Sequence, residues 1–182
     1  MTKAGSPRSE RSSRLAAVMA HVDRENAHDL DGVMATFGQH GYYEDAPWSE
    51  HHDGLEAVRA YYAALFRAAP DLRIEVLRAW DASEAVVLEV RLTGTHIGTW
   101  RGMPGTGRRI DFPLCGVFTF DPDDRLAGER IYYDRATVLH QLGIFVEPDS
   151  MAGKLLTPLL HPLTVLRAAR LALGRGERAR AP

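Results

Sequence analysis

The sequence predicts an α+β fold in which N-terminal helices pack in the concave face of a curved antiparallel sheet. Apolar residues recur at helical spacing up to Phe66, and from Leu72 onward they recur at every second residue. The later segments are joined in part by short turn-like links, Asp81–Glu84 and Pro122–Arg125. Helices followed by a meander of long strands are typical of this fold class.

Three helices precede the sheet in this prediction. Asp29 or Asp31 is placed to cap the second helix, because a carboxylate accepts hydrogen bonds from the free amides at a helix start. Pro70 closes the third helix, since proline cannot continue it. The expected helices are residues 15–28, 29–37 and 55–66, with a short fourth helix at 135–143 after the sheet.

The strands are predicted from alternation of apolar and polar residues. A short strand at 42–45 leads into a polar loop at 46–54, and long strands follow at 72–78, 85–96, 109–120 and 126–134. The link Gly98–Gly107 contains four glycines and a proline, which predicts a mobile loop.

Three of these strands are expected to form one wall of a small-molecule pocket. Leu88 and Phe118 represent the inward phase of two neighbouring strands, and His96 falls in the same phase as Leu88. Counting by two along the last strand places Arg130, Tyr132 and Asp134 on one side. A cation, a phenol and a carboxylate together suit a binding wall better than a purely structural sheet.

Length and composition indicate one domain with an appendage. The chain has 182 residues, of which 45% are hydrophobic and 25% charged, an ordinary globular balance. Its net charge of −2 gives no reason to expect a nucleic-acid partner. The single cysteine, Cys115, cannot form an internal disulfide, which favours a reducing compartment and a cytoplasmic location.

Both ends of the sequence differ in composition from its middle. Residues 1–14 are polar and basic, so we expect a disordered lead without a secretory signal, followed by a domain at 15–146. Residues 147–182 form a leucine- and arginine-rich extension, whose prolines and arginines argue against a transmembrane helix. We expect the extension to pack on the domain or on a second protomer; a peripheral membrane anchor is the alternative.

Two motifs resemble known families. The stretch HIGTWRGMPGTGRR, followed by a strand ending in YYD and a helix running to QLG, resembles the SnoaL-like polyketide cyclase family. That family belongs to the nuclear transport factor 2-like (NTF2-like) superfamily, whose members share a cone of helices wrapped by a bent sheet. The run NAHDLDGVMATF followed by YYEDAPW also resembles ketosteroid isomerase, another member. The resemblance covers about residues 15 to 145 and implies a homodimer.

The cyclase resemblance implies that Asp134 is the general acid/base at the end of the last long strand. A half-buried carboxylate there would have a raised pKa, which suits proton transfer near neutrality. The structural alternative is that Asp134 caps the following helix or pairs with Arg130 or Arg135.

The isomerase resemblance places that family's carboxylate base at Asp45 and its oxyanion-binding tyrosine at His21. The second, protonated aspartic acid of the isomerase falls at about Gly116, so half of the oxyanion hole would be missing and steroid isomerisation is disfavoured. Asp45 is equally well explained as a turn carboxylate satisfied by nearby amides.

The remaining candidates would bind or polarise the substrate. His96 is either a core histidine or a group that polarises a carbonyl and shuttles protons beside Asp134. Aromatic side chains could line a cavity for a polycyclic or terpenoid ligand, with ordinary core packing as the alternative. The expected substrate-binding residues are His21, Tyr43, Trp48, Trp100, Phe118, Arg130 and Tyr132.

No metal ion or other cofactor is expected. Possible ligands are dense between His40 and Asp53, but they lack a metal-binding spacing. The glycines at 102–107 lead into a strand where a phosphate-binding loop would lead into a helix.

The function favoured by the sequence is cofactor-independent proton transfer on an apolar carbonyl compound, as in the aldol ring closure of SnoaL-like cyclases. An epoxide hydrolase like limonene epoxide hydrolase is the enzymatic rival, although its Arg-x-Asp strand motif is absent. A binding or dimerisation module without chemistry also stays open, because a fold alone does not specify a reaction.

Overall fold

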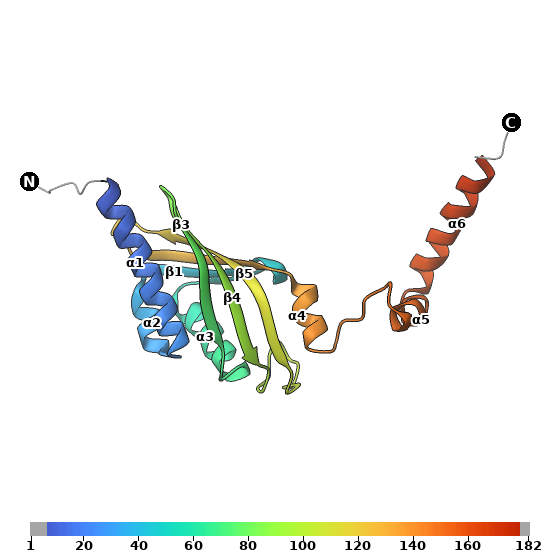
Figure 1. Cartoon of the computed structure of the whole chain (residues 1–182), viewed down its shortest axis with the longest axis horizontal. Coiled ribbons are helices and arrows are strands. Elements are labelled where there is room, and N and C mark those ends of the chain that lie inside the picture. Colours follow the sequence, from blue (N-terminus) through green and yellow to red (C-terminus); the bar gives the residue numbers. More distant parts are fainter. Residues whose placement is uncertain (1–6, 179–182) are drawn as a thin grey trace, which may run out of the picture. The chain divides into compact units, whose positions relative to one another are not determined.

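The chain divides into two compact units, Met1–Leu142 and Gly143–Pro182. The computed structural model describes residues 7–178, with side chains for residues 13–172. The first unit contains helices α1 to α4 and the whole sheet (Figure 1). In its described residues, the second unit contains helices α5 and α6.

The first unit begins with a helical hairpin made of α1 (Pro7–Asn26) and α2 (Leu30–Thr36). Asp29 caps α2, because its carboxylate accepts a hydrogen bond from the backbone N–H of Gly32 at 2.9 Å. The prediction that the second helix begins at an aspartate cap is therefore confirmed at Asp29.

The start of α1 corrects the expectation of a disordered lead at 1–14. Residues 1–6 lie outside the described part of the chain, but the helix already begins at Pro7. Proline is well suited to the first turn of a helix. Farther along the helix, the guanidinium of Arg14 donates a hydrogen bond to Asp124 at 2.7 Å, which ties this part of α1 to the turn before the last strand.

Six strands form one sheet in the order β2-β1-β6-β5-β4-β3. All neighbouring strands run antiparallel except β1 and β6, which are parallel. The predicted antiparallel sheet is thus mixed at this one pair. The strands are β1 (Phe37–Asp45), β2 (Glu50–Asp53), β3 (Arg73–Asp81), β4 (Ala85–Thr95), β5 (Arg109–Phe120) and β6 (Leu126–Tyr133).

Two predicted segments differ in length or kind. The short strand expected at 42–45 begins at Phe37, and the polar loop expected at 46–54 contains a 3₁₀ turn (Ala46–Trp48) and β2. β2 has only four residues and pairs with the end of β1, so its alternation is too short to be recognised in the sequence.

The inward phase predicted for β4 and β5 is confirmed, with Leu88 and Phe118 buried. The phase predicted for β6 is wrong by one residue, because Glu129 and Ile131 are the buried ones. A shift of one position exchanges every side chain between the two faces of a strand. The burial of the apolar Ile131 side chain favours this phase over the predicted one. Glu129 then also points inward, where its carboxylate accepts a hydrogen bond from Tyr62.

Helices cover the concave face of the sheet (Figure 1). α1 packs across β3 and β4, and α3 (Leu55–Ala68) packs against β1 and β2. A fourth helix, α4 (Arg135–Gln141), follows the sheet and packs against β5. Fully buried residues such as Val18, Tyr62 and Leu88 join these layers. The predicted α+β cone is confirmed.

The described residues of the second unit form two helices, α5 (Met151–Leu160) and α6 (Pro162–Arg178). Ser150 caps α5 by accepting a hydrogen bond from the N–H of Gly153 at 3.0 Å. Both helices carry exposed leucines, including Leu155, Leu159 and Leu163. Among the residues that the structure describes, no helix is both long and apolar enough to cross a membrane.

Candidate functional site

An apolar cavity lies inside the first unit, between the inner face of the sheet and helices α1, α3 and α4. Most of its lining is aliphatic or aromatic, from residues such as Leu88, Leu114 and Phe118. Only a few lining side chains can exchange a proton, and they carry the site's chemistry. These are Glu25, Tyr43, Tyr61, His96, Glu129 and Tyr133.

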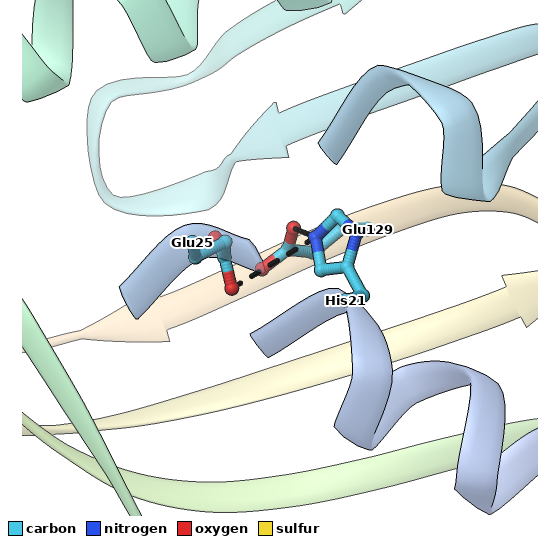
Figure 2. A group of neighbouring side chains, drawn as sticks. All are labelled: His21, Glu25 and Glu129. Carbon is cyan, nitrogen blue, oxygen red and sulfur yellow. Dashed lines mark ion pairs between the residues drawn. The ribbon is translucent and has the colours of Figure 1, made fainter. Parts of the chain in front are cut away.

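Two of the lining carboxyls belong to a buried group of three residues, here called the carboxyl cluster: His21, Glu25 and Glu129 (Figure 2). α1 presents His21 and Glu25 on one face because they are four residues apart, and β6 supplies Glu129. The Nε2 atom of His21 lies 3.5 Å from Glu129 Oε2 and 3.8 Å from Glu25 Oε2. All three side chains are almost completely buried.

Hydrogen bonds fix the orientation of the carboxyl cluster. The hydroxyl of Thr36 donates to the carbonyl of Val33, so its oxygen accepts a hydrogen bond from His21 Nδ1 at 2.7 Å. The other ring nitrogen, Nε2, therefore faces the carboxylates. The hydroxyl of Tyr62 donates to Glu129 Oε2 at 2.6 Å and lies 3.2 Å from His21 Nε2.

The cluster distributes its protons unevenly. Burial opposes a charge on His21, but Glu25 and Glu129 outweigh this effect and raise its pKa. Burial raises the pKa of Glu25 to about 8, with His21 opposing the rise and Glu129 adding to it. Because the pKa of Glu25 lies near 8, this carboxyl is mostly protonated at pH 7.

The carboxyl cluster is also the set of side chains that could hold a metal ion in the described part of the chain. One ligand atom from each residue lies within 4.8 Å of the others. The possible ligands between His40 and Asp53, which lack a metal-binding spacing in the sequence, are not part of this set. The bonds from Thr36 and Tyr62 already explain the present geometry, so no ion is needed to account for it.

His96 presents an unused polar atom to the same cavity. The backbone N–H of Thr106 donates to His96 Nδ1 at 3.3 Å, so a neutral ring carries its proton on Nε2. That Nε2 atom is buried and has no hydrogen-bond partner. Burial lowers the pKa of His96, which keeps the imidazole neutral at pH 7. A buried N–H without a partner is costly and can be satisfied by a ligand acceptor.

A second polar group surrounds Asp45, at the end of β1. Asp45 is fully buried, and its Oδ2 atom accepts hydrogen bonds from Arg101 at 2.6 Å and from the hydroxyls of Tyr61 and Tyr133 at 3.3 Å. Burial raises the pKa of Asp45, with Arg101 opposing the rise. The Oδ1 atom has no hydrogen-bond partner. Asp45 does not line the cavity itself, but both of its tyrosine partners do.

Arg101 fastens the glycine-rich loop, predicted to be mobile, to this second group. Its guanidinium also pairs with Glu50 and lies over the rings of Trp48 and Trp100, at 4.5 and 4.9 Å from their centroids. The indole of Trp48 donates a hydrogen bond to the Tyr133 hydroxyl at 2.8 Å. The loop is therefore anchored at the edge of the cavity through one arginine.

Asp134 lies outside the cavity, which corrects its assignment to the pocket wall. It is the N-cap of α4: one carboxylate oxygen accepts from the N–H of Ala136 at 2.9 Å and the other from the hydroxyl of Thr137 at 2.6 Å. These two hydrogen bonds hold the pKa of Asp134 below its usual value, opposite to the expected rise. Asp134 therefore has the position given by the structural alternative, in which it caps the following helix.

The other predicted residues separate into two groups. Tyr43, Trp100 and Phe118 line the cavity, and His21 lies behind its carboxyls. Arg130 and Tyr132 are exposed on the opposite face of β6, where Arg130 pairs with Glu44 at 2.6 Å. These two residues lie outside the pocket because the inward phase of β6 is shifted by one residue from the predicted phase.

Sequence reasoning missed Glu25, Glu129, Tyr61, Tyr62 and Arg101. The signal for Glu25 was its spacing from His21, four residues along an otherwise apolar helix face. Glu129 would have been found by taking Ile131 as the inward anchor of its strand. Arg101 had no signal of its own, because a glycine-rich loop does not reveal which side chain folds inward.

Comparisons with known proteins agree on the fold. The sequence matches the family model of SnoaL-like polyketide cyclase over residues 15–142. A structure named as a SnoaL-like polyketide cyclase from Jannaschia sp. CCS1 is 23% identical, with a TM-score of 0.67, and the alignment covers 72% of this chain and 92% of that one. No curated protein matches the sequence.

Two Streptomyces structures are also similar. AclR from Streptomyces galilaeus, named as a hydroxylase, is 21% identical with a TM-score of 0.65, covering 74% of this chain and 98% of its own. IdmH from Streptomyces antibioticus, named as a polyketide cyclase, is 18% identical with a TM-score of 0.61. The alignment covers 71% of this chain and 98% of IdmH. At these identities the structures establish the fold alone. The family match spans well over half of the sequence, and the chain therefore belongs to the SnoaL-like polyketide cyclase family.

Proposed function

We propose that the protein is a cofactor-independent acid/base enzyme that closes a ring in an apolar carbonyl compound by an aldol reaction. The observation that carries the proposal is the buried Nε2–H of His96, which has no partner and lines an otherwise largely apolar cavity. Such an atom is a ready donor for a carbonyl or enolate oxygen. Membership of the cyclase family supports the same reaction class.

The chemistry of His96 suits electrophilic stabilisation. When a proton leaves the carbon next to a carbonyl, negative charge develops on the carbonyl oxygen, and a fixed N–H stabilises that charge most strongly where water is excluded. A neutral imidazole donates this hydrogen bond without delivering its proton. The reaction needs no electron transfer, so acid/base groups on the wall are sufficient for it.

The second polar group fits the same proposal as a positioning device. Asp45 holds the hydroxyls of Tyr61 and Tyr133, and these two rings line the cavity beside Trp100. Rigid aromatic walls favour flat, polycyclic substrates, because stacking adds to the burial of apolar area. In this proposal Asp45 orients the wall and does not take the substrate proton.

Exchange of carbon-bound hydrogen tests the proposal without knowledge of the natural substrate. The full chain is incubated in deuterated buffer with polycyclic aromatic ketones that carry acidic α-hydrogens, and incorporation is followed by mass spectrometry. We expect catalysed exchange at the α-carbon. His96→Phe should retain ketone binding, measured by tryptophan fluorescence, and lose about 100-fold in exchange rate.

Asp134→Asn is the matched control, because its carboxylate caps α4 outside the cavity. It should exchange ketone at the wild-type rate. Loss of exchange in Asp134→Asn with normal exchange in His96→Phe would overturn the site assignment. Ketone binding without exchange in the wild type would favour a binding module.

The epoxide hydrolase alternative is tested with the same protein. An apolar epoxide is incubated in ¹⁸O-labelled water, and the products are examined for the label. Labelled diol without ketone exchange would replace the cyclase proposal by hydrolysis.

A further inference from the structure

We propose that the carboxyl cluster is the proton-transfer centre of this site, with Glu129 as the base that takes the α-proton and Glu25 as the acid that protonates the new alkoxide. This assignment rests on the proposed function. Neither residue was predicted from the sequence. Both carboxyls line the cavity and are only 5% exposed, so a bound ligand and not bulk water is their natural partner.

The surroundings of Glu129 suit a base. Its Oε2 atom accepts a hydrogen bond from Tyr62 and lies 3.5 Å from His21 Nε2, so donors hold one side of the carboxylate. Those donors come from α3 and α1, which fixes the carboxylate with respect to the cavity wall. A general base must be held in this way to reach a C–H bond at a defined angle.

The surroundings of Glu25 suit an acid. It lies on α1 and faces the same cavity, and its Oε2 atom is 3.8 Å from His21 Nε2. Two carboxyls this close in an apolar site cannot both be ionised without a large electrostatic cost, so one of them keeps its proton. The raised pKa of Glu25 identifies it as the protonated member.

An independent observation shows where the substrate carbonyl would lie. His96 Nε2 lines the same cavity and has no partner, although the residue is only 4% exposed. The polar arrangement therefore contains a donor for the enolate oxygen as well as the carboxyl pair. If His21, Glu25 and Glu129 formed only a structural ion pair, an unpartnered donor at His96 Nε2 would have no purpose in the same cavity.

The proton balance closes within the cluster. Glu129 accepts the proton from the α-carbon, and the electron pair of that C–H bond forms the new C–C bond to a second carbonyl carbon. The π bond of that carbonyl breaks, and its oxygen takes the proton of Glu25. A proton then passes from Glu129 to Glu25, because a carboxylate oxygen of each lies within 4.8 Å of the other. This transfer restores the protonation state in which the reaction began.

The test uses two reactions that need different groups. Deuterium exchange into a polycyclic ketone needs only the base, whereas ring closure of an aromatic diketone needs base and acid. Glu129→Gln should lower both rates by about 100- to 10,000-fold with unchanged ketone binding. Glu25→Gln should lower ring closure about 100-fold and leave exchange within a few-fold of the wild type.

The matched control is Glu44→Gln, which removes a carboxylate from the opposite face of the sheet, where it pairs with Arg130. Both of its rates should equal the wild-type rates. Glu129→Asp gives a second check, because it keeps a carboxylate and should recover part of the activity that Glu129→Gln loses. Melting temperatures of all variants exclude misfolding as the cause.

A readout without substrate separates this assignment from the proposed function. In protein labelled with ¹³C at the glutamate carboxyls, one carboxyl should titrate near pH 8, and its signal should disappear in Glu25→Gln. Full exchange in folded Glu129→Gln would overturn the assignment alone. A rise in melting temperature with added Zn²⁺ that requires Glu25 and Glu129 would make the cluster a metal site and overturn it. Absence of exchange in the wild type would overturn the proposed function and this assignment together, even with the titration present.

Discussion

At the scale of single residues, the buried carboxyl of Glu25 should make the stability of the protein depend on pH. Its pKa rises from 4.5 to about 8 on folding, mainly through burial. The folded state therefore binds this proton more tightly than the unfolded state does. The resulting stabilisation is complete below about pH 4.5 and is lost as the pH rises through about 8.

Glu25→Gln should remove this dependence. Relative to the wild type, the variant should gain stability as the pH is raised from 5 to 9, because glutamine never ionises in the cluster. Urea unfolding of both proteins at several pH values measures the difference. Parallel stability curves for the two proteins would contradict the pKa assigned to Glu25.

Residue identity alone could predict only part of the site. His96 was found because a polar residue stood in the phase of buried ones, and the structure places it at the cavity. Asp134 was misplaced because resemblance and strand counting agreed on a phase that the packing of Ile131 reverses. Glu25 and Glu129 meet only through tertiary structure, and neither has a local pattern that indicates the other.

At the scale of elements, the link between β4 and β5 contributes His96 and Trp100 to the cavity lining. Arg101 in this loop has a positive φ of 51°, unusual for a residue with a side chain, and its guanidinium reaches Asp45. Because Asp45 is fully buried, its charge depends on this partner.

Arg101→Gln should destabilise the protein by about 2–4 kcal/mol, since it leaves a buried carboxylate without its cation. Asp45→Asn in the same chain should restore part of that loss, because the uncompensated charge is then gone. Denaturant unfolding of the two single variants and the double variant gives the coupling energy. Additive effects would mean that the pair is not coupled in the folded protein.

Elements with long periodic patterns were predictable, and those defined by distant partners were not. Helices α1 to α3 and strands β4 and β5 match their apolar patterns closely, except for the early start of α1. The parallel pairing of β1 with β6 was missed because nothing within either strand encodes it. The same pairing extends β1 beyond the four residues that the pattern indicated.

At the scale of the whole molecule, the apolar core belongs to the first unit. In the described part of the chain, every member of the main core cluster lies between Leu15 and Val138. Residues 143–172, the described side chains of the second unit, add none of it, and leucines of α5 and α6 such as Leu155 and Leu163 are exposed. The expectation that this extension packs on the domain or on a second protomer stays a prediction.

A chain ending at Leu142 should therefore keep its fold. We expect its melting temperature to lie within about 3 °C of the full chain, because the members of the main core cluster all precede Gly143 in the described residues. Calorimetry of both chains measures this. A large fall would mean that the extension packs on the first unit.

Light scattering of the same two chains addresses the predicted homodimer. A dimer that survives truncation uses the sheet domain, as the family resemblance implies. A dimer lost on truncation is held by the leucines of α5 and α6.

The parallel pairing of β1 with β6 also sets the order of events during synthesis. The hydrogen bond between Tyr133 and Asp45 joins residues 88 positions apart, so β1 must wait for nearly the whole sheet before its inner edge is covered. Contacts of such high sequence separation form slowly, and an uncovered strand edge invites pairing between nascent chains. Expression at low temperature with chaperones present should consequently raise the yield of dispersed protein, and the pocket should be the last part of the domain to mature on the ribosome.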